Sequence, residues 1–154
     1  MKTSRTCAAA SALLVLGGLV SCGGGAPALS MNAYLEKSER VCAQLEEDGH
    51  ALPNPKGPRD LPAYLAASTK LTLRAKAELD RLADRFSGRS YVHKIFLDPM
   101  AAQIKAVADV MPQVVKESAQ GATTTLDALE LPQADLPAMG VYGFHECRKV
   151  VGSR

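Results

Sequence analysis

Tryptophan is absent from this 154-residue chain, and aromatic residues of all kinds make up only 5% of it. The few tyrosine, phenylalanine and methionine residues are therefore expected to pack in a core, not to line a large aromatic cavity. Histidine is scarce as well. His50, His93 and His145 lie far apart, and none belongs to an HxxxH, HExxH or paired CxxC pattern. We predict no metal site and no cofactor.

The usual catalytic signatures are missing too. The chain contains no GxSxG, no phosphate-binding P-loop and no dinucleotide glycine fingerprint. Its acidic residues stand on faces of mixed charge, so no general acid–base pair can be assigned. His145, Glu146 and Cys147 form a local cluster that resembles a ligand set, but an oxidised Cys147 would have no thiolate to donate. The sequence predicts that the protein is not an enzyme and has no catalytic residues.

Long apolar runs are absent except near the N-terminus. Lys2 and Arg5 precede an apolar stretch over residues 7–20, which Gly17 and Gly18 interrupt. This stretch is shorter than the roughly 20 residues that span a bilayer. A processing signal is therefore favoured over a transmembrane anchor. An ordinary secretory signal whose cleavage site happens to precede a cysteine is the alternative.

The end of this stretch, Leu19-Val20-Ser21-Cys22, resembles the lipobox of bacterial lipoproteins. The resemblance implies that residues 1–21 are a signal peptide and that cleavage occurs before Cys22. It also implies that Cys22 carries diacylglycerol on its thiol and an acyl chain on its new amino group. The membrane would then be a partner through this lipid, at the extracytoplasmic face of the cell membrane. No aspartate follows Cys22, so nothing suggests retention at an inner membrane.

Removal of the signal changes the charge of the chain. The full sequence has 18 basic and 16 acidic residues, and loss of Lys2 and Arg5 leaves 16 of each. A near-neutral domain is not held to nucleic acid by bulk charge, so we predict no nucleic-acid partner. Residues 22–30 are rich in glycine and are predicted to form a flexible tether with a reach of about 15 Å. Residues 31–154 then form one domain.

Apolar residues recur at spacings of three and four along two segments of this domain, which is typical of helices with one buried face. Ser30 is suited to cap the first helix, and Gly49 to end it. Asp60 is suited to cap the second helix, with Pro62 in its first turn and a stop at Ser87-Gly88. The first stripe comprises Met31, Leu35, Ser38, Cys42 and Leu45, with Tyr34 and Val41 beside it. The second comprises Leu61, Leu65, Ser68, Thr72, Ala75, Leu79, Leu82 and Phe86.

A third stripe begins around a possible helix start at Asp98-Pro99. It comprises Phe96, Met100, Ile104, Val107, Met111, Val114 and Ser118, and Gly121 follows it. A short helix over residues 91–97 precedes the stripe, and whether the two are collinear is open. Pro112 lies inside the third helix and is expected to bend it near Ala108.

The remaining chain predicts a broken fourth helical region. Thr124 and Asp127 have the spacing of a capping box, so a short helix through Glu130 is expected. Asp135 is suited to cap another short helix, Gly143 to turn the chain, and residues 144–147 to return across the bundle. The predicted fold is all-α: a small helical bundle of three main helices plus a broken fourth, with one disulfide.

Cys42 and Cys147 remain after Cys7 leaves with the signal and Cys22 is acylated. An even pair in an oxidising compartment favours a structural disulfide, and the absence of CxxC argues against a redox exchange site. A crosslink closing a loop of about 100 residues stabilises a fold by roughly 4–5 kcal/mol in the chain-entropy model.

The tail of the chain carries a second resemblance. Tyr142, Gly143, Phe144 and Cys147 resemble an ending found in small secreted helical proteins with an early second cysteine. The resemblance supports the Cys42–Cys147 pairing and implies no activity.

Two functions follow as expectations. The first is a membrane-anchored extracytoplasmic lipoprotein acting as a non-catalytic binding or envelope-associated interaction module. The alternative is a carrier of a small apolar ligand within the helical bundle. The partner would be an unknown envelope protein or a small ligand.

Overall fold

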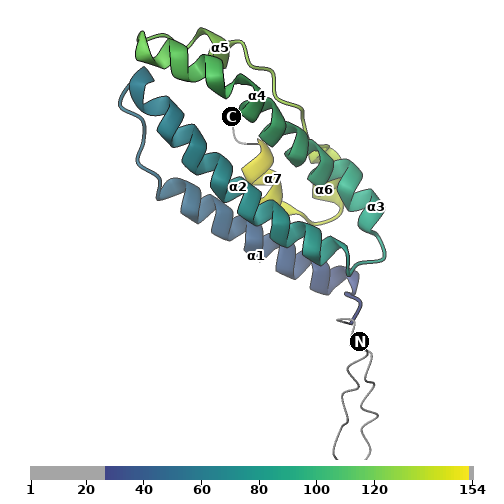
Figure 1. Cartoon of the computed structure of the whole chain (residues 1–154). Helices are drawn as coiled ribbons and strands as arrows, with labels where there is room; N and C mark the ends of the chain where they lie inside the picture. Colours follow the sequence, from purple (N-terminus) through teal and green to yellow (C-terminus); the bar gives the residue numbers. More distant parts are fainter. Residues whose placement is uncertain (1–26, 153–154) are drawn as a thin grey trace, which may run out of the picture.

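The computed structural model describes residues 27–152, and the regular structure in this range is helical apart from one isolated bridge between Leu29 and Phe86. The predicted all-α bundle with one disulfide is confirmed (Figure 1). Its elements are α1 (Met31–His50), η1 (Pro58–Asp60), α2 (Leu61–Ala83), α3 (Arg89–Val92), the π-helical turn η2 (His93–Leu97), α4 (Asp98–Ala119), α5 (Thr124–Asp127), α6 (Leu136–Val141) and α7 (His145–Gly152).

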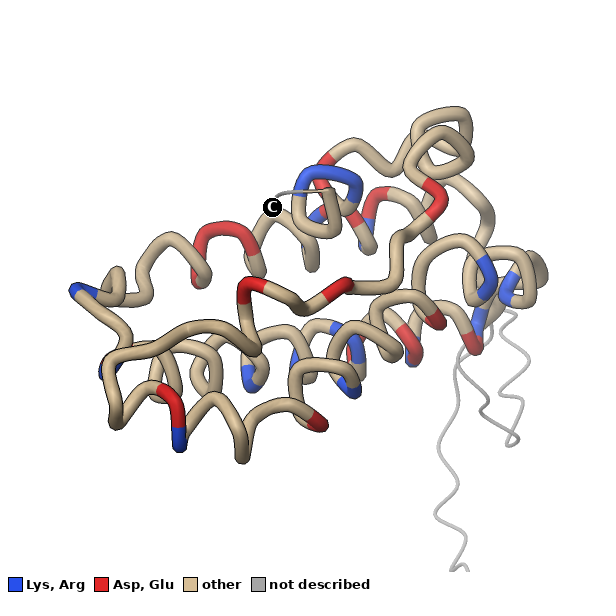
Figure 2. The backbone as a smooth tube through the Cα atoms, turned by 90° about the horizontal axis from the view of Figure 1, so that it is seen from above, with Lys and Arg blue, Asp and Glu red and all other residues tan. Residues whose placement is uncertain are grey.

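The three long helices α1, α2 and α4 form the frame of the bundle. The antiparallel helices α1 and α2 lie side by side, α4 packs along α2, and α7 packs on α1 (Figure 1). We call the end where α1 begins and α2 finishes the proximal end, and the opposite end the distal end. Acidic and basic positions are interspersed over the helices in Figure 2, as expected for helix faces of mixed charge.

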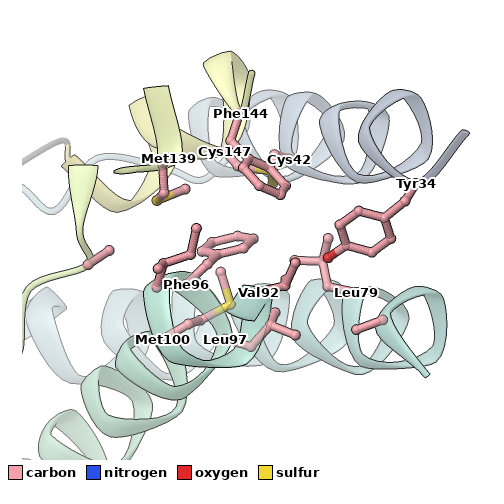
Figure 3. Packing of buried hydrophobic residues seen from close by; sticks show 13 residues of the cluster. Tyr34, Cys42, Leu79, Val92, Phe96, Leu97, Met100, Met139, Phe144 and Cys147 are labelled. Carbon is pink, nitrogen blue, oxygen red and sulfur yellow. A yellow bond between two sulfur atoms is a disulfide. The ribbon is translucent and has the colours of Figure 1, made fainter. Parts of the chain in front are cut away.

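The buried cluster joins both cysteines to aromatic and aliphatic side chains from every long helix. Figure 3 shows Phe144, Met139 and the disulfide on one side of this core, facing Phe96 and Met100. Besides these residues the cluster contains Tyr34, Leu79, Ala83, Val92, Ile95, Leu97 and Ala134.

Helix α1 follows its sequence pattern closely. The Ser30 hydroxyl accepts a hydrogen bond from the Ala33 N–H at 3.2 Å, as predicted for an N-cap. The predicted stripe is the buried face: it carries Tyr34, Ser38, Cys42 and Leu45 into the interior. The helix ends at His50, one residue after the predicted stop at Gly49.

Helix α2 begins where predicted, but for a different reason. The Asp60 carboxylate accepts the backbone N–H of Lys56 at 2.9 Å and caps no N–H of the helix, so the predicted capping role is wrong. The three-residue turn η1 leads into α2 instead. The helix also ends at Ala83, before the predicted Ser87-Gly88 stop.

The unwound end of α2 holds the incoming chain. The Leu29 N–H donates to the Arg85 carbonyl at 2.7 Å, and the Arg85 guanidinium donates to the Pro27 carbonyl at 3.0 Å. Pro27 and Leu29 were assigned to the tether by sequence, yet both contact the folded domain. Contacts with the folded domain therefore begin by Pro27.

The segment before Pro99 is continuous with the helix after it. Residues 89–119 are helical without interruption, and the π-helical turn η2 precedes the proline. Proline has no N–H to return to the carbonyl four residues earlier, which here belongs to Ile95. That carbonyl instead accepts the Asp135 N–H at 3.2 Å. This hydrogen bond links η2 to Asp135, the N-cap of α6. Helix α4 itself runs on through Pro112 to Ala119.

The end of α4 and the start of α5 share one carboxylate. Gly121 has a φ of +78°, and the N–H groups of Gly121 and Ala122 donate to the carbonyls of Ser118 and Glu117, which forms a Schellman motif. The Glu117 side chain accepts both the N–H and the hydroxyl of Thr125, at 2.8 and 2.6 Å. The predicted Thr124–Asp127 capping box is therefore wrong, and α5 ends at Asp127 instead of Glu130. Asp135 does cap α6, by accepting the Ala138 N–H at 3.0 Å.

Candidate functional site

The structural disulfide predicted from the cysteine count is present. Cys42 in α1 and Cys147 in α7 are bonded, with their Cα atoms 4.9 Å apart, and 105 positions separate them in sequence. Both residues are fully buried. Because both sulfurs are bonded, neither offers a thiolate to a metal or a substrate.

A carboxylate from α1 caps the helix that carries the second cysteine. Glu39 accepts the backbone N–H groups of His145, Glu146 and Cys147 at 3.0, 2.7 and 3.3 Å. The three N–H groups stand at the N-terminus of α7, where donors lack intrahelical partners and a negative charge is favoured by the helix dipole; the His145 N–H also donates to the Gly143 carbonyl at 3.2 Å. The disulfide and Glu39 together fix the position of α7 on α1.

The last turns of α7 form one wall of an open hollow toward the distal end of α1 and α2. This distal hollow has a volume of about 490 Å³ and is lined by Leu45, Glu46, Gly49, His50, Asn54, Tyr64, Ser68, Leu71, Thr72, Lys149 and Val150. A second hollow of about 410 Å³ lies against the loop between α1 and α2. Asn54 and Tyr64 line both, so the two are adjacent.

Charged side chains gather at the α7 wall of the distal hollow. The Lys149 ammonium donates to both carboxylate oxygens of Glu146 at 2.8 Å. This bond raises the pKa of Lys149, and the negative charges of Glu46 and Glu39 act in the same direction. Lys149 therefore stays protonated at neutral pH. A protonated, already bonded lysine is a binding group and not a base.

A second group of polar side chains lies in the interface of α1 and α2. Within the described residues, Tyr34 Oη, Ser38 Oγ and Asp80 Oδ1 are buried without a hydrogen-bond partner. Burial raises the pKa of Tyr34 to about 12, and the nearby Asp80 charge adds to the shift. A phenol with this pKa supplies no phenolate at neutral pH.

The histidines remain dispersed in the fold. His50 borders the distal hollow, His93 lies 3.3 Å from Asp98, and His145 begins α7. In residues 27–152 no three or more His, Cys, Asp or Glu side chains gather in a way that holds a metal ion. Cys22, the predicted lipidation site, lies outside the described residues.

Glu39 is the residue that sequence reasoning missed. It stands three positions before Cys42, one helical turn away on the same side of α1, so a segment bonded to Cys42 comes within its reach. The assumed disulfide and this spacing together were a usable signal. Lys149 and Tyr64 gave no such signal, because they line the hollow only through the packing of three separate segments.

Comparison with protein-family models, with curated proteins and with solved structures gave no match. Over residues 27–152, no helix combines the length and apolar character needed to cross a bilayer.

Proposed function

We propose that this chain is a lipid-anchored extracytoplasmic protein of a bacterial envelope, and that its helical domain binds a partner without catalysis. The observation that carries the proposal is the buried Cys42–Cys147 disulfide. Structural disulfides form in oxidising compartments outside the cytoplasm. That is the compartment to which the lipobox-like Leu19-Val20-Ser21-Cys22 would direct the chain.

The geometry of the domain supports the two parts of this function. The chain enters at the proximal end, where Pro27 and Leu29 contact Arg85. Glu46 and His50 of the distal hollow lie at the other end of α1. A helix of 20 residues is about 30 Å long. An anchor at Cys22 and a binding surface at the hollow would thus be separated by most of the length of α1.

Intact mass spectrometry of the protein from membrane fractions tests the anchor and the compartment together. We expect loss of residues 1–21, added acyl mass on Cys22, and no thiol available for alkylation until a reductant is added. The matched control is Cys22→Ala, which should keep the signal and gain no lipid. A chain that retains residues 1–21, or that carries free Cys42 and Cys147, contradicts the proposal.

The second candidate, a carrier of a small ligand, draws on the two adjacent hollows. Their lining combines apolar side chains such as Leu71 with polar ones such as Asn54 and Lys149, which suits an amphipathic molecule. The hollows open at the surface, so the ligand would sit against the bundle and not inside its packed core.

Native mass spectrometry of the protein extracted in mild detergent tests the carrier. A bound small molecule should be lost in Leu71→Glu, which places a charge in the distal hollow. The control is Leu73→Glu, on the same helix at a side chain that is already half exposed. Retention of the molecule by both variants, or its absence from the wild-type protein, removes the carrier hypothesis.

A further inference from the structure

The proximal part of the bundle exposes an unusual set of apolar and aromatic side chains. Val141 is 85% exposed, and its neighbour Tyr142 is 37% exposed. Tyr91 is 39% exposed, and its ring centroid lies 4.6 Å from that of Tyr142. We call Tyr91, Val141 and Tyr142 the aromatic patch. Val141 has no role in the core, and with the paired rings of Tyr91 and Tyr142 it forms an exposed apolar surface that is available to a partner.

Contacts at both flanks place the patch at the proximal end. After Tyr142 the chain turns at Gly143, where φ is +89° and an added Cβ would lie 3.6 Å from Cδ1 of Leu35 in the second turn of α1. Before Tyr91 the chain passes Gly88, which lies directly against the ring of Phe86. Phe86 bridges to Leu29, where the chain enters the domain. Figure 1 shows α3 and the start of α1 at the same end of the bundle.

The length of chain before the domain limits how far this end can be from a lipid anchor. Pro27, whose carbonyl accepts hydrogen bonds from Arg85, is five positions after Cys22. A fully extended chain covers at most about 3.6 Å per residue, so this span cannot exceed roughly 18 Å. This step rests on the proposed function. If Cys22 is acylated, the aromatic patch is held close to the bilayer surface.

We propose that the aromatic patch rests on the lipid bilayer, with Val141 at the acyl boundary and the rings of Tyr91 and Tyr142 at headgroup level. Tyrosine favours this position because its ring is apolar while its hydroxyl remains hydrated. The patch is small, but the anchor would keep it at a high effective concentration near the bilayer, so a weak contact with lipid is enough.

The nearby charges do not select a lipid of one sign. Arg89 lies 3.9 Å from Asp84, and both are exposed. These two opposite charges offset each other, and we expect apolar and aromatic contact to carry the interaction. The contact should therefore be similar on neutral and anionic vesicles and change little with salt.

The absence of tryptophan from the sequence gives a direct test. Val141→Trp places the sole indole of the protein in the patch. Val115→Trp is the matched control, because Val115 is a 49% exposed valine toward the distal end of α4. The mature full-length lipoprotein is reconstituted into phosphatidylethanolamine and phosphatidylglycerol vesicles with brominated acyl chains, and indole quenching is measured.

We expect severalfold stronger quenching and a blue-shifted emission for Val141→Trp than for Val115→Trp. Replacing Tyr91 and Tyr142 by alanine in the Val141→Trp background should weaken the quenching. Equal quenching of the two indoles overturns the proposal. A second outcome also overturns the proposal: the Val141→Trp indole is shielded from aqueous acrylamide but is not quenched by brominated lipid. If this shielding grows with protein concentration, the patch contacts a second copy of the chain.

The failure of this inference is distinguishable from failure of the proposed function. Intact mass reports acylation of Cys22 on the same sample. Acylated protein with equal quenching at both positions contradicts only the bilayer contact. Protein without acyl mass on Cys22 contradicts the anchor on which the inference rests, and with it the inference.

Discussion

Glu39 accepts the backbone N–H of Cys147, whose side chain is bonded to Cys42 one helical turn further along α1. One turn of α1 thus holds α7 twice, by a covalent bond and by a charged cap. The two attachments act on the same short helix but differ in chemistry. Reduction breaks the first, and loss of the carboxylate breaks the second.

The disulfide should supply a large part of the stability of this domain. Its partners are 105 positions apart, and closing a loop of that length stabilises a fold by about 4–5 kcal/mol in the chain-entropy model. We expect the Cys42→Ala/Cys147→Ala variant to lose a free energy of unfolding of this size in urea titrations. Wild-type protein unfolded in reductant should show a similar loss. An unchanged midpoint in both would contradict a stabilising role.

Removing the Glu39 cap should loosen α7 specifically. Glu39→Ala removes the acceptor of the Glu146 and Cys147 N–H groups, whereas the His145 N–H keeps its hydrogen bond to the Gly143 carbonyl, and loss of an N-cap costs about 1–2 kcal/mol. Hydrogen exchange should accelerate in residues 145–152 while α2 and α4 keep their protection. Glu36→Ala is the control on the same helix, because it removes only an exposed pair with Arg40, worth at most about 0.5 kcal/mol. Equal effects of the two variants would be evidence against the cap.

Tyr34 should make the domain less stable at alkaline pH. Its pKa is about 12 in the folded protein against 10.0 for the free side chain. Because the pKa of Tyr34 is higher in the folded state, the unfolded chain loses the phenol proton first. The contribution of the protonated phenol to the free energy of unfolding is therefore complete below pH 10 and is lost as the pH rises toward 12. The loss is about 2–3 kcal/mol. In Tyr34→Phe, this part of the alkaline dependence of unfolding should disappear, while stability at pH 7 is unchanged or greater because an unpartnered hydroxyl is removed. The same alkaline slope in both proteins would exclude Tyr34 as its source.

Replacing glycine by alanine should reduce stability at Gly143 but not at Gly49. Gly143 has a φ of +89°, so Gly143→Ala should destabilise the domain by about 1–2 kcal/mol. Gly49 lies in α1 with nothing within 4 Å of an added Cβ. Gly49→Ala should therefore be neutral or stabilise by up to about 1 kcal/mol. Thermal unfolding of the two variants checks the contrast, and a shift of the same sign in both would refute it.

The local sequence is sufficient to predict the long helices and some of the helix ends. The three–four spacing placed Tyr34, Ser38, Cys42 and Leu45 on the buried face of α1, including the serine. Ser30 and Asp135 cap their helices because an N-cap depends only on residues within one turn. These features are local, so the pattern alone contains them.

Features made by contacts between distant segments were missed. Eight residues are too few to make a stable helix on their own. Helix α7 forms because Glu39 and Cys42 hold it, and that contact is not visible in the pattern of the tail. Similarly, Asp60 bonds to Lys56 in the preceding loop, and Glu117 replaces the expected capping box at α5. Both carboxylates bond to groups other than those that the local pattern predicts.

The distal hollow shows the same limit for the candidate site. Its lining comes from α1, the following loop, α2 and α7. No spacing within one segment brings Tyr64 near Lys149. The cysteine pair was predictable from the even cysteine count and the expected oxidising compartment, whereas the shape of the hollow beside it depends on where α7 packs.

The Cys42–Cys147 bond also makes most of the domain a covalent ring. Tension applied between the two ends of the domain can lengthen only the described residues outside that ring, from Pro27 to Cys42 and from Cys147 to Gly152. Even a fully extended chain gains a modest contour from so few residues. While the bond is intact, tension between the two ends of the domain bypasses α2 and α4, and only the part of α1 before Cys42 and the part of α7 after Cys147 lie in its path.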